Sequence, residues 1–342
     1  MSKRIIPIAV AVVAVAAVGL LLVLWSTSTD SEAAPAATTS TTTAPAATTT
    51  TTTEPTTTTT AAAVDDGFPV TIDAPNGPVT IRERPTRIVS ISPTSTEVLF
   101  AVGAGGQVIA VDNQSNFPAE APVTDISGFT PNVEAIAALD PDLVFLSFDP
   151  GDVIAGLQVV GIPVILHGSA FSLDEAYAQW EQVGVATGNI ADAMALVAST
   201  QESIASAVAS LPDGTNALSY YYELDPTFYS ATSATFVGEL FALTSMTNIA
   251  DEADPDGFGF PQLTAEYIVD SDPGLIYLAD TKCCGQNEQE LAARPGWDSM
   301  TAVSAGTVIE LDDDVASRWG PRIAELFNIV VASILDLDSA DA

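Results

Sequence analysis

The sequence predicts an α/β protein made of two lobes with mostly parallel sheets, joined by a single long helix. Three observations lead to this fold class. Segments typical of buried strands alternate with helical segments in both halves of the chain. The stretch 189–211, which is rich in Ala and holds no Gly or Pro, separates these halves. Finally, the segment "VEAIAALDPDLVFL" at 133–146 returns as "AEYIVDSDPGLIYL" at 265–278.

The two copies of the repeated segment share one offset of 132 residues, which is too long for a solenoid period. In each copy an N-cap candidate, Asn132 or Thr264, precedes a short helix whose second residue is Glu134 or Glu266. Asp-Pro ends each helix, because Pro lacks the N–H and disfavours α geometry in the residue before it. The apolar run that follows is typical of a strand buried between helix layers. The repeat therefore indicates two structurally equivalent halves.

The N-terminal end of the chain carries a long apolar run. Residues 5–25 are 21 uncharged, mostly apolar residues, about the 20 needed to cross a bilayer. Lys3 and Arg4 precede them, which predicts a cytoplasmic tip at 1–4 and an anchor at 5–25, with the rest of the protein outside the cell membrane. A cleaved signal peptide is the alternative, because "SEAAPAA" offers small residues for cleavage. No Cys follows the run, so we expect no lipid-modified N-terminus.

Residues 26–66 have the composition of a disordered stalk. From Ala33 to Ala63 every residue except Ser40 and Glu54 is Ala, Thr or Pro, and such a segment cannot build a core. The folded part is therefore expected to be tethered but free to swing. We divide that part into an N-terminal lobe at 67–188, the helix at 189–211 and a C-terminal lobe at 212–342.

The chain is strongly acidic, with a net charge of −35 from 44 acidic and 9 basic residues. This charge excludes nucleic acid as a partner and repels anionic lipid and polyanionic ligands. It favours a neutral or cationic ligand, or one that a local Arg meets. Solubility in a salty medium accounts for most of the charge.

The first half opens with a hairpin and continues as alternating strands and helices. Asn76-Gly77 lies between apolar alternations, the strongest short-range hairpin signal, and we expect this hairpin at a sheet edge. "RIVSIS" is a strand of the buried type, "PTSTEVLFAVGAG" a helix closed by glycines, and "QVIAVD" a second strand. The alternation continues through "IPVILHG", which implies a mostly parallel sheet.

The long helix and the second half complete the pattern. Asn189 is the expected cap of the long helix, and the spacing of Met194, Val197, Ile204 and Val208 is typical of a helix that packs one face. Strand and helix segments then begin again with "NALSYYYEL" and "SATFVGELFAL". They end with "TVIEL" and a closing helix over 321–337.

Three segments, 87–121, 132–145 and 220–251, carry a family resemblance that spans Arg87 to Leu335. The chain resembles the substrate-binding proteins of ABC importers for vitamin B12 and iron–siderophore complexes. The resemblance implies two Rossmann-like lobes bridged by a rigid helix, with a ligand cleft between them. It also implies a transported small-molecule metal chelate rather than a cofactor, and permease subunits as partners. We expect a monomer.

In this family one Glu on the outer surface of each lobe docks onto Arg clusters of the two membrane subunits. The matching positions here are Glu134 and Glu266. Pairing of a carboxylate with Arg is charge-assisted and gives orientation as well as attraction. Each Glu also complements the dipole of its own helix. A symmetric permease thus explains why the chain repeats the motif.

Ligands in such folds bind beyond the carboxyl ends of the parallel strands. From these ends, with weight on aromatic side chains, we select the following ligand-binding candidates: Ser92, Pro93, Thr94, Phe117, Phe129, Phe148, Tyr222, Phe228, Phe260, Cys283, Cys284, Arg318 and Trp319. By resemblance, several of these rings lie at or next to positions that face the corrinoid in B12-binding members. The Trp residues that those members use in the first lobe are Gly128 or Ser147 here. Core packing is the alternative for Phe228 and Phe260.

The candidate residues also bear on the ligand. Flat rings suit a bulky ligand with apolar faces. Family members that bind anionic ferric siderophores often line the cleft with several Arg, whereas only Arg318 and Arg322 lie near such a position here. We therefore expect a cobalamin-like corrinoid, with haem or a ferric siderophore as the alternative. A surface sensor or adhesion module is the alternative of another class.

Cys283 and Cys284 are the only cysteines and are adjacent. Outside the cell we expect a disulfide between them, in a turn that Gly285 permits. A free thiol pair or soft metal ligation is the alternative, but the single His, His167, lies in the other lobe, so no protein-only metal site is expected. No phosphate loop or metalloprotease motif occurs, and we expect no enzyme activity.

Overall fold

The computed structural model describes residues 67–341, with side chains described to residue 337. The predicted tip, anchor and stalk at 1–66 lie outside these residues. No helix within 67–341 combines the length and the apolar character that crossing a bilayer requires. The described residues belong to one compact unit, 62–342.

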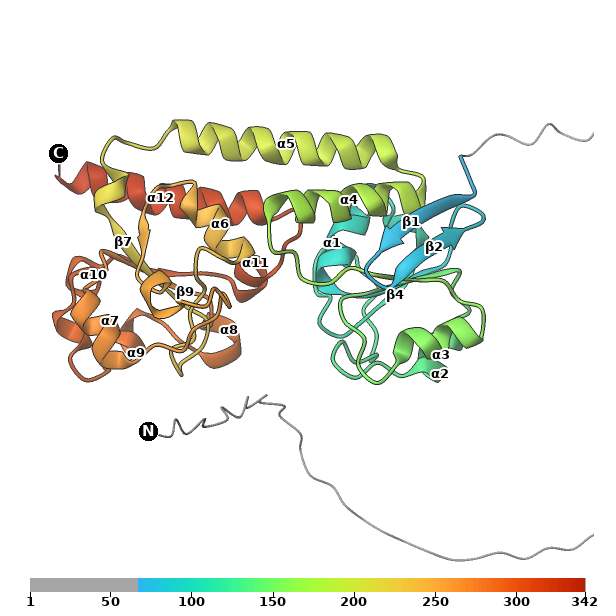
Figure 1. Ribbon diagram of the computed structural model, residues 1–342, viewed down its shortest axis with the longest axis horizontal. Helices are drawn as coiled ribbons and strands as arrows, with labels where there is room; N and C mark the ends of the chain where they lie inside the picture. The colour runs from blue at the N-terminus through green and yellow to red at the C-terminus, as the bar shows by residue number, and fades with distance from the viewer. Residues whose placement is uncertain (1–66, 342) are drawn as a thin grey trace, which may run out of the picture. The chain divides into compact units, whose positions relative to one another are not determined.

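The first lobe holds a four-stranded parallel sheet in the order β4-β3-β5-β6, with helices on its faces (Figure 1). Its elements are β1 Val70–Ala74, β2 Gly77–Ile81, β3 Ile88–Ile91, α1 Pro93–Ala101, η1 Gly105–Gln107, β4 Val108–Val111, α2 Val133–Ala137, β5 Leu143–Leu146, α3 Val153–Val159, β6 Val164–Leu166 and α4 Leu173–Thr187.

The second lobe follows α5 Ile190–Ala209 and holds a parallel sheet in the order β10-β9-β7-β8. Its elements are η2 Thr215–Ala217, β7 Ser219–Glu223, α6 Phe236–Ala242, β8 Thr247–Asn248, η3 Asp251–Ala253, α7 Ala265–Ser271, β9 Leu275–Leu278, α8 Thr281–Cys284, α9 Glu288–Ala292, η4 Trp297–Ser299, α10 Thr301–Ala305, β10 Val308–Glu310, α11 Asp313–Ser317 and α12 Ile323–Asp341. The two sheets have the same strand succession, which confirms the predicted α/β class with two lobes.

The repeated segment forms the same structure in both lobes. Asn132 accepts a hydrogen bond from the N–H of Ala135 at 2.8 Å, and Thr264 accepts one from Tyr267 at 3.2 Å, so both predicted caps are confirmed. After each helix the Asp that precedes Pro, Asp140 or Asp272, adopts a positive φ. The register between β3 and β5 also recurs between β7 and β9, shifted by 132 residues. The equivalence therefore extends beyond the repeated letters.

The predicted hairpin forms, with Ala74 paired to Gly77 across its turn. Its expected place at the edge of the parallel sheet is wrong, because β1 and β2 make a two-stranded sheet of their own. The Asn76 side chain instead reaches β6, donating to Val164 O at 2.9 Å and accepting from Leu166 N at 3.1 Å. One side-chain amide thus substitutes for a backbone ladder between the hairpin and the sheet.

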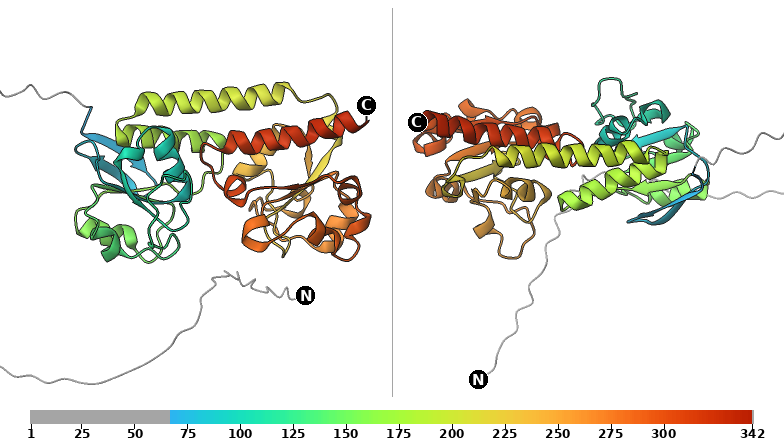
Figure 2. Two further views of the ribbon diagram at one scale, coloured as in Figure 1. Left: turned by 180° about the vertical axis from the view of Figure 1, so that it is seen from behind. Right: turned by 90° about the horizontal axis from the view of Figure 1, so that it is seen from above.

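Helix α5 runs from above the first lobe to above the second, packed on α4 at one end and on α12 at the other (Figures 1 and 2). Val197 and Ile204 of its predicted face are buried, but Met194 is 59% exposed. The buried stripe instead runs through Ala193, Val197 and Thr200, because small residues let the neighbouring helices approach closely. Met194 lies beside this stripe.

Asn189 does not cap α5 as predicted, because its side chain is engaged elsewhere. Its Oδ1 accepts from Arg84 Nη2 at 2.8 Å, and its Nδ2 donates to Thr187 Oγ1 at 3.2 Å. Gly188 turns the chain between α4 and α5 with φ of 75°, a left-handed conformation that favours glycine. These contacts fix the corner between the two helices.

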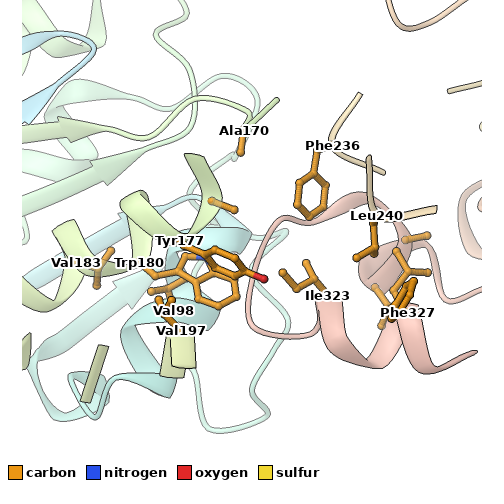
Figure 3. Packing of buried hydrophobic residues seen from close by; sticks show 14 of the residues in the cluster. Val98, Ala170, Tyr177, Trp180, Val183, Val197, Phe236, Leu240, Ile323 and Phe327 are labelled. Carbon is orange, nitrogen blue, oxygen red and sulfur yellow. The ribbon is translucent and has the colours of Figure 1, made fainter. Parts of the chain in front are cut away.

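One apolar cluster continues from lobe to lobe beneath α5. Figure 3 shows Tyr177 and Trp180 of α4 on one side, with Phe236, Ile323 and Phe327 of the second lobe on the other. All five side chains are buried in the same cluster. The lobes therefore share a core at this seam, which limits how far they can separate.

Candidate ligand-binding cleft

A cavity of about 260 Å³ lies between the lobes. It is lined by Ser92, Pro93, Thr94, Gln114, Gly128, Phe129, Ser147 and Phe148 of the first lobe, and by Asp314, Ser317, Arg318 and Trp319 of the second. Seven of the predicted ligand-binding residues are among them: Ser92, Pro93, Thr94, Phe129, Phe148, Arg318 and Trp319. The strand-end rule, that ligands bind beyond the carboxyl ends of parallel strands, thus leads to a cavity that both lobes line.

The carboxyl ends of β3, β4 and β5 supply most of the first-lobe wall. Ser92 follows β3 and caps α1, its Oγ accepting from Ser95 N at 3.1 Å. Pro93 is the first helical residue, where its missing N–H is harmless. The N-terminal end of α1, which carries partial positive charge, therefore lies at the cavity.

Aromatic rings from both lobes contribute apolar surface. Phe129 is 66% exposed and Phe148 is 42% exposed, although both line the cavity. Trp319 faces them from the second lobe, and its Nε1 donates to Gln179 Oε1 at 2.8 Å, which fixes the indole. Such exposed rings are suited to a ligand with a large apolar face.

Gly128 and Ser147 also line the cavity, at the positions where B12-binding members have Trp according to the resemblance. A Cβ at Gly128 would lie 2.8 Å from Asp112 Oδ1. Asp112 is buried and accepts from Gln114 N at 2.7 Å and from Ser115 Oγ at 2.7 Å, so it cannot yield easily. This part of the wall therefore has no room for an indole.

Arg318 is buried, and internal groups occupy both of its terminal nitrogens. Nη1 donates to Glu97 Oε1 at 2.8 Å and to Asn116 Oδ1 at 3.0 Å. Nη2 donates to Gln114 O at 3.1 Å and to Asp314 Oδ1 at 2.5 Å. All four terminal N–H groups thus have partners, and Arg318 offers little to an anionic ligand.

Charges around the cleft are balanced in the same way. Glu97 is buried and also accepts two hydrogen bonds from Arg322, at 2.6 and 3.0 Å. Burial alone would raise the pKa of Asp314, but hydrogen bonds from Asn116 and Lys282 and the charge of Arg318 hold this pKa below its usual value. The wall therefore carries paired charges of both signs rather than a free cation.

Two predicted residues lie away from the cavity. Phe117 lines a separate hollow of about 230 Å³, where the Arg322 guanidinium lies 4.4 Å from its ring centroid. Tyr222 is fully buried, and its hydroxyl donates to Ala316 O at 3.0 Å. A ligand contact for Tyr222 is therefore wrong, because the ring packs in the core of the second lobe.

Phe228 and Phe260 do not line the cavity either. Phe228 stacks on Trp297 with ring centroids 5.8 Å apart, and the Arg294 guanidinium lies 5.4 Å from the Phe228 ring centroid, so Phe228 follows the packing alternative. Phe260 is 51% exposed in the loop before α7.

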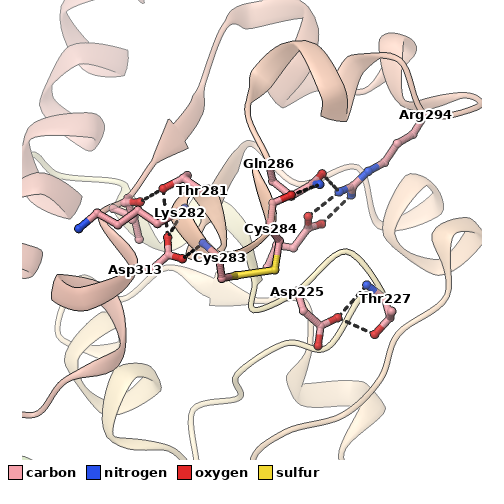
Figure 4. Close-up of a disulfide and its surroundings, with 11 residues drawn as sticks. Asp225, Thr227, Thr281, Lys282, Cys283, Cys284, Gln286, Arg294 and Asp313 are labelled. Atoms are coloured by element: carbon pink, nitrogen blue, oxygen red, sulfur yellow. Dashed lines mark hydrogen bonds and ion pairs between the residues drawn. A yellow bond between two sulfur atoms is a disulfide. The ribbon is translucent and has the colours of Figure 1, made fainter. Parts of the chain in front are cut away.

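Cys283 and Cys284 form a disulfide in the short helix α8 (Figure 4). The Asp313 carboxylate accepts from the backbone N–H of Lys282 at 2.9 Å and of Cys283 at 2.7 Å, and so stabilises the start of this helix. The cysteines do not line the 260 Å³ cavity, but Lys282 Nζ lies 3.0 Å from Asp314 Oδ2, a cavity group. Helix α8 therefore adjoins the cleft through an ion pair.

Sequence reasoning did not select Gln114, Asp314 and Ser317, which line the cavity. All three follow predicted strands, so the strand-end rule reaches them, whereas the preference for aromatic side chains passed over them. His167 also follows a strand, but it is buried and bonded to Gln182 at 2.9 Å, and burial lowers its pKa to about 4. It lies outside the cavity.

Glu134 and Glu266 are exposed in α2 and α7. These helices lie at the ends of their lobes that point away from α5 and α12 (Figures 1 and 2). Neither Glu lines the cavity. The structure thus presents two equivalent carboxylates on separate lobes, free of the cleft.

Comparisons with known proteins agree with this architecture. A family model described as periplasmic binding protein matches residues 88–315. An uncharacterized ABC transporter substrate-binding lipoprotein of Bacillus subtilis is 32% identical over 268 residues, covering 75% of this chain and 83% of that protein. A cobalamin-binding protein of Halobacterium salinarum is 29% identical over 270 residues, covering 75% of this chain and 72% of that protein.

Solved structures show the same fold. A possible iron-binding periplasmic protein from Staphylococcus epidermidis has a TM-score of 0.64 at 24% identity, covering 74% of this chain and 99% of that one. A periplasmic haem-binding protein from Roseiflexus has a TM-score of 0.63 at 23% identity, covering 74% and 98%. At these identities the likeness is one of fold.

Proposed function

The chain belongs to the periplasmic binding protein family, as a substrate-binding component of an ABC transporter for B12, haem or iron–siderophore ligands, and we propose that its own ligand is a cobalamin-like corrinoid. Proteins of this family bind solutes for transport and are not enzymes. Their partners are permease subunits and small-molecule ligands.

The hydrogen bonds of Arg318 are the observation on which the choice of ligand rests. Because its terminal N–H groups are taken by Glu97, Asp314 and two further groups, the cleft has no free guanidinium for a carboxylate. Haem carries two propionates and ferric siderophore complexes are mostly anionic, whereas the corrin periphery of cobalamin carries amides. Amides are matched by polar neutral groups such as Gln114 and Ser317.

The aromatic surface supports the same ligand class. Phe129, Phe148 and Trp319 offer ring faces from both lobes. The cavity volume of about 260 Å³ is below the roughly 300–1,000 Å³ of typical ligand pockets, so a corrinoid enters in part and covers the exposed rings with the remainder. We propose that the disulfide turn of α8 forms a stiff corner beside it.

The ligand is tested with the full-length protein by thermal shift against cyanocobalamin, cobinamide, haem and a ferric siderophore. A ligand at one hundred times its Kd stabilises the folded protein by about 2.7 kcal/mol. Cyanocobalamin is expected to raise the midpoint, and Trp319→Ala to remove most of the shift. Phe171→Ala, which removes an exposed ring outside the cavity, serves as the matched control. A shift with haem alone would overturn the corrinoid assignment.

Delivery requires docking to the permease. We propose that Glu134 and Glu266 pair with Arg groups on its two subunits, which the exposure of both carboxylates supports. The anchor at 5–25 and the stalk at 26–66 would hold a monomeric protein at the membrane, with its folded part outside the cytoplasm. The domain limits 67–188, 189–211 and 212–342 belong to the same proposal.

A further inference from the structure

Asp280 is a buried carboxyl group without a hydrogen-bond partner. It lies directly after β9 and before α8, it is 0% exposed, and neither side-chain oxygen accepts a hydrogen bond. Although it occupies the N-cap position of α8, its side chain makes no cap, because the Asp313 carboxylate takes the free N–H groups of this helix. Asp280 is therefore buried in the second lobe with no hydrogen-bond donor on either side-chain oxygen.

Arg294, the cation whose charge acts on Asp280, is already engaged with another carboxylate. Glu223 of β7 is fully buried and accepts from both terminal nitrogens of Arg294, at 2.5 and 2.6 Å. Arg294 also donates to Gln286 at 2.7 Å, and it lies 4.5 Å from the Trp297 ring centroid. Arg294, whose hydrogen bonds are drawn in Figure 4, thus acts on two buried carboxyl groups but donates to Glu223 alone of the two.

The other charged and titratable groups facing Asp280 do not supply the missing positive charge. Asp313 of α11 adds negative charge, and Tyr221 and Tyr222 of β7 are neutral phenols. An isolated buried carboxylate is costly to ionise. Burial first, and then the charge of Glu223, raise the pKa of Asp280 to about 7, although Arg294 opposes them.

We propose that Asp280 is a proton-binding site that couples pH to the position of α8 and, through α8, to ligand affinity in the cleft. Loss of the proton to water places a second negative charge beside Glu223. Outward movement of α8 relieves this repulsion, because it lets water reach Asp280. The part of the proposal that concerns affinity rests on the function proposed above.

The link from α8 to the cleft runs through named contacts. Lys282 of α8 forms ion pairs with Asp312 at 2.5 Å and with Asp314 at 3.0 Å. Asp314 in turn holds Arg318, and both line the cavity. Displacement of α8 therefore loosens the second-lobe wall, and we expect ligand to bind more weakly above the titration than below it.

The proton site is tested first without ligand, by thermal unfolding of the wild type and Asp280→Asn between pH 4 and pH 8. The folded pKa lies above the ordinary value of 3.8, so the folded state holds the proton more tightly and stability is lost as pH rises. Between about pH 4 and pH 7, the folding equilibrium constant of the wild type should fall relative to that of the variant by up to tenfold per pH unit. Above about pH 7 the ratio of the two constants should stay unchanged. Asp213→Asn, at an exposed position, should run parallel to the wild type throughout.

A second measurement does not depend on a variant that folds. The side-chain carboxyl carbon of Asp280, followed by NMR in the wild type, should titrate near pH 7. A midpoint near pH 4, or parallel stability curves for the wild type and Asp280→Asn, would overturn the proton site.

The coupling is then tested by cyanocobalamin titration from pH 6 to pH 8. The Kd of the wild type should rise, by at most tenfold per pH unit since one proton is linked, while that of Asp280→Asn should stay flat. Equal pH dependence in both proteins would refute the coupling. If cyanocobalamin binds at no pH, the corrinoid assignment fails, and the ligand-free measurements still decide whether Asp280 takes up the proton.

Discussion

Replacing Glu97 by Ala removes the carboxylate that joins the two lobes. Glu97 belongs to α1 of the first lobe, and it accepts three hydrogen bonds from Arg318 and Arg322, which lie 221 and 225 residues later. The Glu97 and Arg318 side chains are 1% and 9% exposed, so water cannot replace the lost partner without rearrangement.

The expected loss follows from this burial. Removing one partner of a buried ion pair costs about 3–5 kcal/mol, because the opposite charge remains buried and uncompensated. For a protein of this size 1 kcal/mol corresponds to about 2–4 °C, so Glu97→Ala should lower the unfolding midpoint by about 6–20 °C. Asp314 still pairs with Arg318, which places the expected value toward the lower end.

Thermal and denaturant unfolding of the wild type and the variant measure this loss. Glu202→Ala, at an exposed position of α5, is the control and should change stability by less than about 0.5 kcal/mol. A triple variant, Glu97→Leu with Arg318→Met and Arg322→Met, removes Glu97 and both of its cations. Because Asp314 keeps its ion pair with Lys282, this variant should recover most of the loss. If Glu97→Ala stays within 1 kcal/mol of the wild type, the lobes are not held together by this cluster.

Three further predictions concern docking, cysteine chemistry and the membrane. Glu134→Ala or Glu266→Ala should reduce uptake in transport assays more than tenfold at unchanged ligand Kd, because losing a buried charge-assisted contact costs about 2–5 kcal/mol; normal uptake by the double variant would contradict docking. Thiol labelling of the native protein without reductant should find no free cysteine, since each has only its neighbour as a partner in the chain; two labelled thiols per chain would disprove the pairing. An uncleaved anchor at 5–25 should keep the protein with membranes after a high-salt wash, as fractionation followed by intact-mass analysis can show, whereas a mature start near Ala34 would indicate a signal peptide.

Local chemistry made much of the fold predictable. A cap such as Asn132 acts on an N–H group three residues away, and Asp-Pro ends a helix through the geometry of its own peptide bond. Strand periods and helix stripes depend only slightly on distant residues, so the alternation of strands and helices and the equivalence of the lobes followed from the pattern. The hydrogen bonds of Asn76 could not be predicted in this way, because its partners are about 90 residues away in β6.

The cleft was predictable in position but not in detail. The strand-end rule found Ser92 and Phe148 because carboxyl ends of parallel strands meet at one edge of the sheet. Tyr222 was selected near the carboxyl end of β7, yet it lies within that strand, and its hydroxyl reaches Ala316 in the core, 94 residues later. The pairing of the Arg318 charge depends on Glu97 from the other lobe, and no spacing along the chain signals such a pair.

The apolar seam beneath α5 has a thermodynamic consequence. Because side chains of both lobes share one cluster, exposing either half exposes the other, and the two lobes should melt as a single cooperative unit. Calorimetric and van't Hoff enthalpies should then agree despite the two-lobed architecture. A chimaera that exchanges one lobe with a relative to change ligand preference must therefore carry the partners of Trp180 and Phe327 with it, or its halves will have no common core.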